Sequence, residues 1–437
     1  MSDNLKAEDI GTVPTQTQPE VQLTEAQLKA KTKFEEWWGR VEENADIHSA
    51  TDFSHVPQVH RIFGYAGVGK TTVTKRVVAG KRGIAYMAFT GKAAMVMRKH
   101  GTPATTIHSQ LYKPVVTHKE EYQQLTKSLD EAQAKGDHKT VKELRESIAE
   151  ARKVRFVINE ESRLYHDDIS LLVLDEVSMV GEENGRDLLS VRKPILVLGD
   201  PGQLPPIQGQ GYFTNQRPDS MLEEIHRQAL GNPIIKLSFS ARSNVPVPRG
   251  EWEFNGKLSF HRAQAQAREE DFVSADQIII GKNAGRLAMN RKMRAVLGRS
   301  GTYPVKDDKL ICLKNDSDLG IFNGQMFTVM EVLDNYDKAI HLKLLDDDGN
   351  TKVVLSHRAH FDEYHEPGKV KDLAWWEFKN TQQFDFGYCI TVHKAQGSQY
   401  DTVCFIDDKF FVWDRPNRAK WLYTGVTRAA ESIRIFS

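Results

Sequence analysis

Cysteine is scarce in this chain of 437 residues, which contains three: Cys312, Cys389 and Cys404. Three thiols so far apart cannot form a disulfide framework or a cysteine-rich zinc site. Long apolar runs are also missing, since segments such as LLVL at 171–174 fall far short of the ~20 residues of a membrane helix. The N-terminus lacks the apolar core of a signal peptide. We therefore expect a soluble, cytoplasmic protein. Its 40% hydrophobic and 27% charged residues exclude a disordered or fibrous chain.

Net charge is absent as well, because 59 Lys and Arg balance 59 Asp and Glu. Taken alone, this balance argues against a polyanionic partner. The charges are segregated, however, since residues 61–101 contain nine basic side chains and no acidic one. This stretch is either a surface for a polyanion or a scatter of solvated cations.

Four short apolar runs predict buried strands, at residues 61–63, 84–89, 170–176 and 194–200. They alternate with helical stretches, as in a parallel sheet covered by helices on both faces, so the predicted fold class is α/β. Residues 1–20 are polar and are expected to form a flexible tail. The pattern from Leu23 predicts a helix whose capping box is formed by Thr24 and Gln27.

Two segments depart from this alternation. Residues 119–153 carry apolar residues three and four apart on either side of a break at 135–137, which predicts an antiparallel helical hairpin. Its flanks at 113–118 and 155–160 could pair as strands. Residues 302–361 contain four or five strand-like runs separated by turn residues, which predict a small barrel inserted in a second α/β domain.

The strongest motif is GYAGVGKTT at 64–72. It follows a predicted strand and opens a predicted helix, which is the context of a P-loop that binds ATP or GTP. Glycines let backbone N–H groups surround the phosphates, and the helix N-terminus adds its positive end. Lys70 is expected to neutralise the phosphates, and Thr71 to offer its hydroxyl to Mg²⁺. The predicted nucleotide-binding residues are Gly64, Gly67, Gly69, Lys70, Thr71 and Thr72.

An acidic pair, Asp175 and Glu176, follows the apolar run at 171–174. Open α/β sheets bind ligands at the carboxyl ends of their strands, so Asp175 is expected to hold Mg²⁺ and Glu176 to activate the attacking water. The alternative is a helix cap. Gln203, in the turn after the run at 194–200, could hydrogen-bond the γ-phosphate or the water. Arg227 and Arg428 are candidates for charge stabilisation during phosphoryl transfer, although each could be an ordinary surface or salt-bridged arginine.

Taken in this order, the segments resemble superfamily 1 helicases, most closely the RecD-like and Dda-like DNA helicases. The segments similar to that family's motifs I, Ia, Ib and II to VI are GYAGVGKTT (64–72), FTGKAA (89–94), TIHSQL (106–111), DEVSM (175–179), GDPGQLPP (199–206), LEEIHRQ (222–228), ITVHKAQGSQYD (390–401) and LYTGVTRA (422–429). LTEAQ at 23–27 is similar to the Q motif. The resemblance covers residues 21–437 apart from the hairpin.

The resemblance implies two RecA-like domains that bind ATP and Mg²⁺ in the cleft between them. Gln27 would read adenine. Arg428 would reach across from the second domain, while Arg227 would close over the γ-phosphate. The residues implied on the first domain's side of the cleft are Lys70, Thr71, Asp175, Glu176 and Gln203.

The resemblance also implies a path for single-stranded DNA across both domains, along motifs Ia, Ib and V. His393 could instead only orient motif V. Phe89 could be a core residue, and the family usually has proline in its place, so DNA contact there could differ. The implied contacts with phosphates or bases are Phe89, Thr90, His108, Thr391, His393 and Lys394.

The resulting prediction is a monomeric, ATP- and Mg²⁺-dependent helicase that moves 5′-to-3′ on single-stranded DNA and unwinds duplex or fork DNA, in replication, recombination or repair. The alternatives are a superfamily 1 helicase of opposite polarity, a P-loop phosphotransferase, and a DNA-binding module with a vestigial ATPase. The hairpin could be a strand-separating wedge, a spacer, or an arm that binds a partner such as a single-strand-binding protein. The expected domains are a tail (1–20), a first RecA-like domain (21–112 and 156–228) with the inserted hairpin (113–155), and a second RecA-like domain (229–301 and 381–437) with an SH3-like insertion (302–380).

Overall fold

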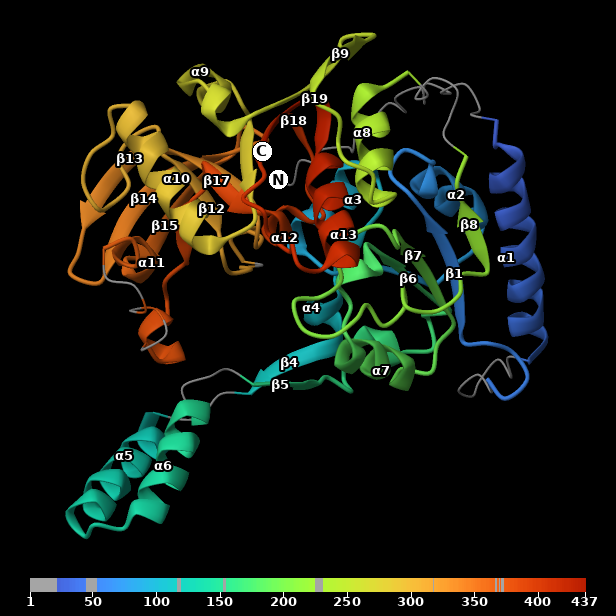
Figure 1. The fold of residues 1–437 in the computed structure, drawn as a ribbon. Coiled ribbons are helices and arrows are strands. Elements are labelled where there is room, and N and C mark those ends of the chain that lie inside the picture. The colour runs from blue at the N-terminus through green and yellow to red at the C-terminus, as the bar shows by residue number, and fades with distance from the viewer. Residues whose placement is uncertain are drawn as a thin grey trace, which may run out of the picture.

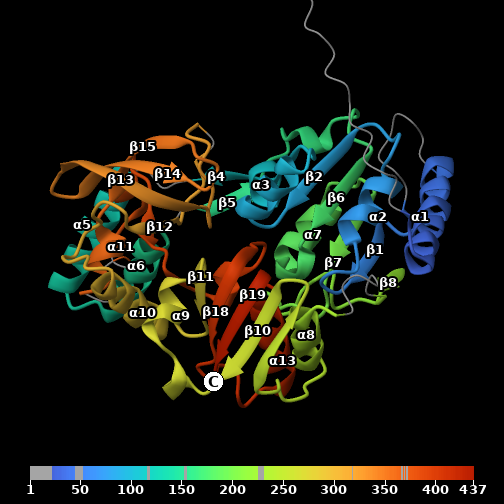
Figure 2. The same cartoon turned by 90° about the horizontal axis from the view of Figure 1, so that it is seen from above.

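The computed structural model describes the chain outside residues 1–21, 45–52, 116–118, 152–154, 225–230, 317, 366–367, 369 and 371–372. The tail expected at 1–20 and the candidate Arg227 therefore lie outside the described residues. Figures 1 and 2 show two sheets flanked by helices, a third, antiparallel sheet beside them, and a helical hairpin that extends away from the rest.

The first sheet is parallel throughout, and its strand order is β3-β2-β6-β7-β1-β8. The four apolar runs predicted as strands lie in β1, β2, β6 and β7, which confirms the α/β class. The strands are β1 (Val59–Gly64), β2 (Ile84–Ala88), β3 (Ala104–Thr106), β6 (Leu171–Asp175), β7 (Ile195–Gly199) and β8 (Ser220–Leu222). The accompanying helices are α1 (Glu25–Asn44), α2 (Lys70–Val77), α3 (Gly91–Lys99), α4 (Ile107–Leu111) and α7 (Glu182–Ser190).

Successive residues of these strands enter two different cores, because side chains alternate across a sheet. In β6, Val173 belongs to the core that contains Phe34 and Trp37 of α1 and Val73 of α2. Its neighbours Leu172 and Leu174 pack on the other face, with Leu188 of α7. Helices thus cover both faces, and the polar strand ends are left at the sheet edge.

The second sheet has the order β17-β11-β18-β19-β10-β9, in which β9 alone is antiparallel to its neighbour. Helices α8 and α13 pack together beside it, and α10 covers the opposite face. The strands are β9 (Gly250–Phe254), β10 (Lys257–Arg262), β11 (Gln277–Ile280), β17 (Cys389–Thr391), β18 (Tyr400–Ile406) and β19 (Ala429–Phe436). The helices are α8 (Pro233–Arg242), α9 (Glu269–Val273), α10 (Asn283–Val296), α12 (Val392–Ala395) and α13 (Arg415–Val426).

The third sheet is antiparallel, in the order β15-β14-β13-β12-β16, and α11 (Ala359–Asp362) packs near β16. Its strands are β12 (Lys309–Cys312), β13 (Met326–Asn335), β14 (Ala339–Asp346), β15 (Thr351–His357) and β16 (Phe384–Phe386). The strand β16 lies beyond residue 380, where the insertion was expected to end, so the sheet continues into the segment that leads to β17. Short 3-10 helices lie at Arg163–Tyr165, Val177–Met179, Gln264–Gln266 and Trp375–Phe378.

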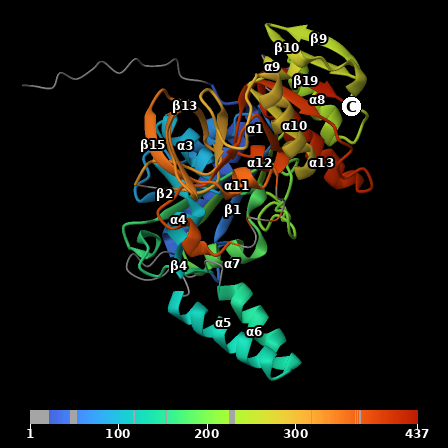
Figure 3. The same ribbon diagram turned by 90° about the vertical axis from the view of Figure 1, so that its left-hand side faces the viewer.

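The helical hairpin predicted from the spacing at 119–153 is formed by α5 (Lys119–Ala134) and α6 (His138–Ala151). It stands on a two-stranded stem of β4 (Tyr112–Val115) and β5 (Arg155–Ile158), and Figure 3 shows it projecting from the body. The rings of Tyr122 in α5 and Trp376 lie 4.6 Å apart, so the hairpin touches the segment before β16. No helix among the described residues is long and apolar enough to cross a membrane.

Candidate active site

The P-loop turn joins β1 to α2 and has a shape that only glycine tolerates. Gly67 and Gly69 adopt φ angles of 81° and 79°, a region that residues with a Cβ rarely enter. A Cβ at Gly64 would lie 2.7 Å from Cγ2 of Val68, which is too close. Lys70 opens α2 and its Nζ donates to the carbonyl oxygens of Gly64 (2.7 Å) and Tyr65 (3.1 Å), so the ammonium lies over the turn.

Gln27 supports the P-loop from behind. Its Nε2 donates to the carbonyl oxygen of Val68 over 2.9 Å, and its Oε1 accepts from the backbone N–H of Thr24 over 3.0 Å. Thr24 Oγ1 accepts in turn from the Gln27 N–H, which confirms the predicted capping box. Gln27 is 1% exposed and is not among the residues lining the cavity described below. Its reading of adenine stays a prediction.

The acidic pair stands at the carboxyl end of β6. Burial, followed by the charge of Glu176, raises the pKa of Asp175 to about 6. Asp175 Oδ1 accepts from the backbone N–H of Glu176 over 2.8 Å. Glu176 has a φ of 54°, a strained conformation for a residue with a side chain. Two carboxylates are thus held close together at a buried strand end. Their mutual repulsion there makes the doubly ionised pair unfavourable unless a cation lies beside it.

Gln203 projects from the turn after β7 and is 5% exposed. Its backbone N–H donates to the carbonyl oxygen of Asp200 over 3.1 Å. Within the described residues, its Oε1 has no hydrogen-bond partner, although the side chain lines the cavity. A buried amide oxygen without a partner in a cavity wall is suited to a ligand or a water.

Arg428 enters the same cavity from the second sheet's side. Its Nε donates to the carbonyl oxygen of Thr424, its Nη1 to that of Ser398 (both 3.0 Å), and its Nη2 to Thr427 Oγ1 over 3.1 Å. Arg428 is 6% exposed, these three contacts are with neutral oxygens, and its side chain lines the cavity. The cavity has a volume of about 530 Å³. The predicted site residues that line it are Gly67, Gly69, Lys70, Thr71, Asp175, Glu176, Gln203 and Arg428.

A tyrosine that sequence reasoning missed connects the two sides of the cleft. The hydroxyl of Tyr423, on α13, donates to Asp200 Oδ2 and accepts from the backbone N–H of Ala66 in the P-loop, each over 2.7 Å. Burial and the charge of Asp200 raise the pKa of Tyr423, and burial raises that of Asp200. The only signal in the sequence was the position of Tyr423, five residues before Arg428 in the segment LYTGVTRA.

Two further contacts hold the same turn. Thr424 Oγ1 accepts from the backbone N–H of Leu204 over 2.9 Å, and Gln396 Nε2 donates to the carbonyl oxygen of Leu204 over 2.9 Å. The turn at 200–204 is therefore bound by the two segments that follow β17 and precede β19. A change in the separation of the sheets would break these contacts.

Five of the six residues predicted to contact DNA fall into two groups, and Lys394 is described after them. Thr90 and Thr391 cap α3 and α12 through their hydroxyls. A Cβ at Gly397 would lie 2.8 Å from Thr90 Oγ1, so the segments after β2 and β17 approach each other. Burial lowers the pKa of His393 below its ordinary value, which disfavours the charged imidazole.

The second group is aromatic. Phe89 and His108 have ring centroids 6.2 Å apart, and Tyr112 and Phe156 of the hairpin stem lie 5.1 and 5.9 Å from the imidazole. Phe89 packs against the core on one face of the first sheet. Burial lowers the pKa of His108. The cluster thus joins the core to the stem of the hairpin.

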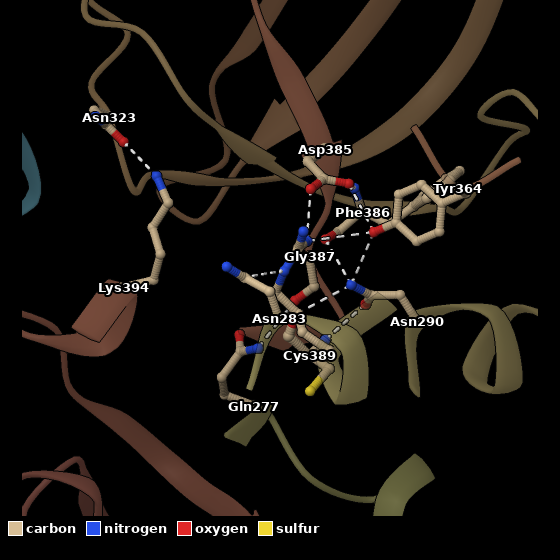
Figure 4. Close-up of polar contacts among 11 residues, drawn as sticks. Gln277, Asn283, Asn290, Asn323, Tyr364, Asp385, Phe386, Gly387, Cys389 and Lys394 are labelled. Atoms are coloured by element: carbon tan, nitrogen blue, oxygen red, sulfur yellow. Dashed lines mark hydrogen bonds and ion pairs between the residues drawn. The ribbon is translucent and has the colours of Figure 1, made fainter. Parts of the chain in front are cut away.

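Lys394 and the strand β17 belong to a region that Figure 4 shows in detail. Lys394 is exposed, and its Nζ donates to Asn323 Oδ1 over 3.1 Å. Asn290 of α10, on the other side of this view, is fully buried and hydrogen-bonds to the backbone N–H and carbonyl oxygen of Cys389. Tyr364 Oη donates to Asp385 Oδ1 over 2.7 Å. These contacts join the second and third sheets just before α12.

Comparisons with known proteins agree with this architecture. Residues 50–244 match the model of an AAA domain, and residues 386–435 match that of a UvrD-like helicase C-terminal domain. The chain is 29% identical to the ATP-dependent RecD2 DNA helicase of Deinococcus radiodurans over 290 residues, which cover 61% of this chain and 36% of the relative. It thus spans about a third of that relative's length.

Among solved structures, the fold is similar to that of a Pif1 helicase studied in unwinding of forked duplex DNA, with a TM-score of 0.50, 17% identity and coverage of 95% and 92% of the two chains. The Pif1 helicase of Candida albicans gives a TM-score of 0.50 at 14% identity, with coverage of 95% and 94%. A P-loop, an acidic pair and an arginine around one cleft between two such sheets define a P-loop protein with two RecA-like domains. The two domain matches and the RecD2 relative show that parts of the chain are similar to those of DNA helicases.

Proposed function

We propose that this chain is an ATP-driven DNA helicase that moves along one strand and separates duplex or forked DNA. The observation that carries the proposal is the single cavity lined by the P-loop and the acidic pair from one sheet and by Arg428 from the other. A site shared in this way is complete only when the two domains are close together. Hydrolysis in it can therefore be coupled to their relative movement.

The residues of the cavity fit ATP and Mg²⁺. Thr71 and Asp175 offer a hydroxyl and a carboxylate, which are the oxygen ligands that Mg²⁺ prefers. The raised pKa of Asp175 indicates a position that favours a cation. Mg²⁺, when bound, supplies charge neutralisation at the phosphates. Lys70 leaves the carbonyl oxygens of Gly64 and Tyr65 to pair with the phosphates.

Each remaining polar group of the cavity has a role in the displacement. Glu176 accepts the proton of the attacking water, and Gln203 Oε1, which is free of partners among the described residues, orients that water. Arg428 stabilises the charge that develops on the transferred phosphoryl group, a contribution worth ~10³–10⁵ in rate for arginine fingers. Arg227, outside the described residues, is proposed to close over the γ-phosphate.

The single strand is proposed to cross both domains along Thr90, His393 and Lys394, with 5′-to-3′ movement as in the RecD-like resemblance. The basic stretch at 61–101 supports a polyanionic partner. The RecD2 relative is an ATP-dependent DNA helicase, and the Pif1 structure concerns unwinding of forked duplex DNA, which supports the same partner here. The remaining proposed contacts are Phe89, His108 and Thr391.

The hairpin is proposed as the arm that binds a partner such as a single-strand-binding protein, on a chain that acts as a monomer. Its position on a thin stem away from the cleft supports this role over one in hydrolysis. Replacing residues 116–154 by a short turn should leave DNA-stimulated ATPase intact and abolish stimulation by the partner. Loss of unwinding on naked forks would instead make the hairpin a strand-separating wedge.

Strand displacement tests the proposed function. Duplexes with only a 5′ tail or only a 3′ tail are mixed with the protein, ATP and Mg²⁺, and the displaced strand is measured. We expect displacement from the 5′-tailed duplex and none with the Lys70→Ala variant. Displacement from the 3′ tail alone would reverse the polarity and leave a helicase. ATPase activity that DNA does not stimulate would favour a phosphotransferase.

A further inference from the structure

The segment after β18 presents large apolar side chains to solvent. Val412 is 61% exposed and Trp413 is 75% exposed. Tryptophan carries the largest apolar surface of any side chain and is highly buried on average. Phe410 and Phe411, just before them, are partly buried against the core of the second sheet. Residues 408–413 are called the aromatic loop below.

The aromatic loop lies against the residues proposed to contact DNA. The imidazole of His393 is 6.4 Å from the ring of Phe410 and 6.5 Å from that of Phe411, measured between centroids. Trp413 continues this series, 6.4 Å from Phe411. The strands β11, β17 and β18 are parallel neighbours, so the loops at their carboxyl ends share one edge of the sheet. A row of rings thus runs from motif V outward to solvent.

The backbone holds the aromatic loop in a defined and strained shape. Lys409 and Phe411 have φ angles of 58° and 55°, a region that bulky side chains rarely enter. Asp408 Oδ2 accepts from the backbone N–H of Lys282 over 2.8 Å, and Arg418 Nη1 donates to the carbonyl oxygen of Phe410 over 3.1 Å. Strain of this kind persists only where its surroundings enforce it, and it is concentrated at functional sites. A preformed loop also loses little entropy when a ligand binds.

Charge at this edge favours a polyanion. Lys282, before α10, Lys394, in α12, and Lys409, after β18, are exposed. The carboxylates nearby already have partners within the protein. Asp407 pairs with Arg418, Asp408 accepts from the backbone N–H of Lys282, and Asp414 caps the first turn of α13. Cations beside an exposed aromatic ring are the combination that binds single-stranded nucleic acid.

We propose that the aromatic loop is a stacking platform for an unpaired base of the translocating strand, with Trp413 as the stacking ring and Lys282 and Lys409 beside the flanking phosphates. The proposal rests on the proposed function, since it assigns a further contact to the same strand. A duplex hides the faces of its bases, so the platform selects single strands. Because every base has a π face, it reads no sequence.

Binding measurements with three variants test the platform. Anisotropy of a labelled oligothymidylate is measured without nucleotide for wild type, Trp413→Ala, Trp413→Phe and Tyr336→Ala. Tyr336, at the turn between β13 and β14, is a matched control because it is an exposed aromatic (52%) far along the third sheet. We expect Trp413→Ala to bind about 5- to 150-fold more weakly, the range that stacking of one base supplies. Trp413→Phe and Tyr336→Ala should stay near wild type.

Two further readouts separate stacking from charge and from folding. The dependence of affinity on salt should be unchanged in Trp413→Ala and shallower in Lys409→Ala, because only the lysine releases counterions from the strand. On a strand without bases, wild type and Trp413→Ala should bind equally. Circular dichroism and DNA-independent ATPase verify that each variant is folded.

The outcomes distinguish this inference from the function on which it rests. Wild-type protein that binds no single strand would refute the proposed function and the platform together. Binding by wild type that Trp413→Ala retains in full would refute the platform alone, as would an equal loss on intact strands and strands without bases.

Discussion

Replacing Tyr423 by Phe removes one hydroxyl and keeps the ring, so it tests whether this group couples the two domains. The hydroxyl donates to the buried carboxylate of Asp200 and accepts from the N–H of Ala66. A hydrogen bond to a charged group contributes about 1.5–3 kcal/mol and one between neutral groups about 0.5–1.5 kcal/mol. The sum is about 2–4.5 kcal/mol for the arrangement in which the P-loop, Asp200 and α13 are in contact.

The two hydrogen bonds form only when the cleft is closed, because Tyr423 belongs to one domain and Asp200 and Ala66 to the other. Tyr423→Phe therefore destabilises the closed arrangement and leaves the open one unchanged. Closure also places Arg428 and Glu176 on one cavity. We therefore expect kcat for DNA-stimulated ATP hydrolysis to fall by at least ~30-fold, which corresponds to about 2 kcal/mol. Binding of ATP to the P-loop should change far less, since Lys70 and Thr71 remain.

The assay combines steady-state ATPase measurements with a double-mutant cycle on Asp200→Asn. Because the two side chains share one bond, the double variant should lose less than the sum of the single losses. Tyr400→Phe is the matched control. It is a buried tyrosine in the second domain whose hydroxyl has no hydrogen-bond partner among the described residues. It should retain wild-type kcat.

Strict additivity of Tyr423→Phe and Asp200→Asn would refute the reasoning. So would an unchanged kcat for Tyr423→Phe. If Tyr423→Phe weakened ATP binding and left kcat unchanged, the hydroxyl would stabilise the P-loop alone and would not contribute to closure of the cleft.

Three further predictions concern stability. Asp175→Asn should raise the free energy of unfolding by about 1–3 kcal/mol in nucleotide-free, metal-free buffer while abolishing ATPase. The reason is that burial and the charge of Glu176 raise the pKa of Asp175 to about 6, so the ionised carboxylate destabilises the fold at pH 7. A lower urea midpoint would contradict this. Burial lowers the pKa of His60 to about 4, so protonation of this group first in the unfolded state costs about 3 kcal/mol of stability as the pH falls from about 6.5 to 4. The raised pKa of Asp175 acts in the opposite direction over nearly the same range, so the test is a difference between two proteins. In thermal melting as a function of pH, His60→Phe should lose about 3 kcal/mol less than wild type, and equal losses would exclude a contribution from His60. Gly425→Ala should cost about 1–3 kcal/mol in urea unfolding, since its Cβ would overlap the fully buried ring of Phe405; a neutral effect would show that the ring can move.

Local features were predictable from sequence because their geometry is set within a few residues. The capping box of Thr24 and Gln27 involves residues three apart. The second hydrogen bond of Gln27, to Val68, joins residues 41 positions apart, and nothing in the motif indicated it. The strand β16 was missed for the same reason, since its three residues pair with β12 more than 70 positions away.

By itself, the sequence determined the chemistry on each side of the cleft: the glycines of the P-loop, the acidic pair at the end of β6, and the arginine after α13. Spacing, apolar periodicity and residue type are sufficient for such features, because backbone geometry converts them directly into local structure. Only the tertiary structure decided which of these groups share a cavity, and it added the bond between Tyr423 and Asp200, 223 positions apart. A contact between side chains in different domains depends on how the two domains lie relative to each other, and no local pattern encodes that arrangement.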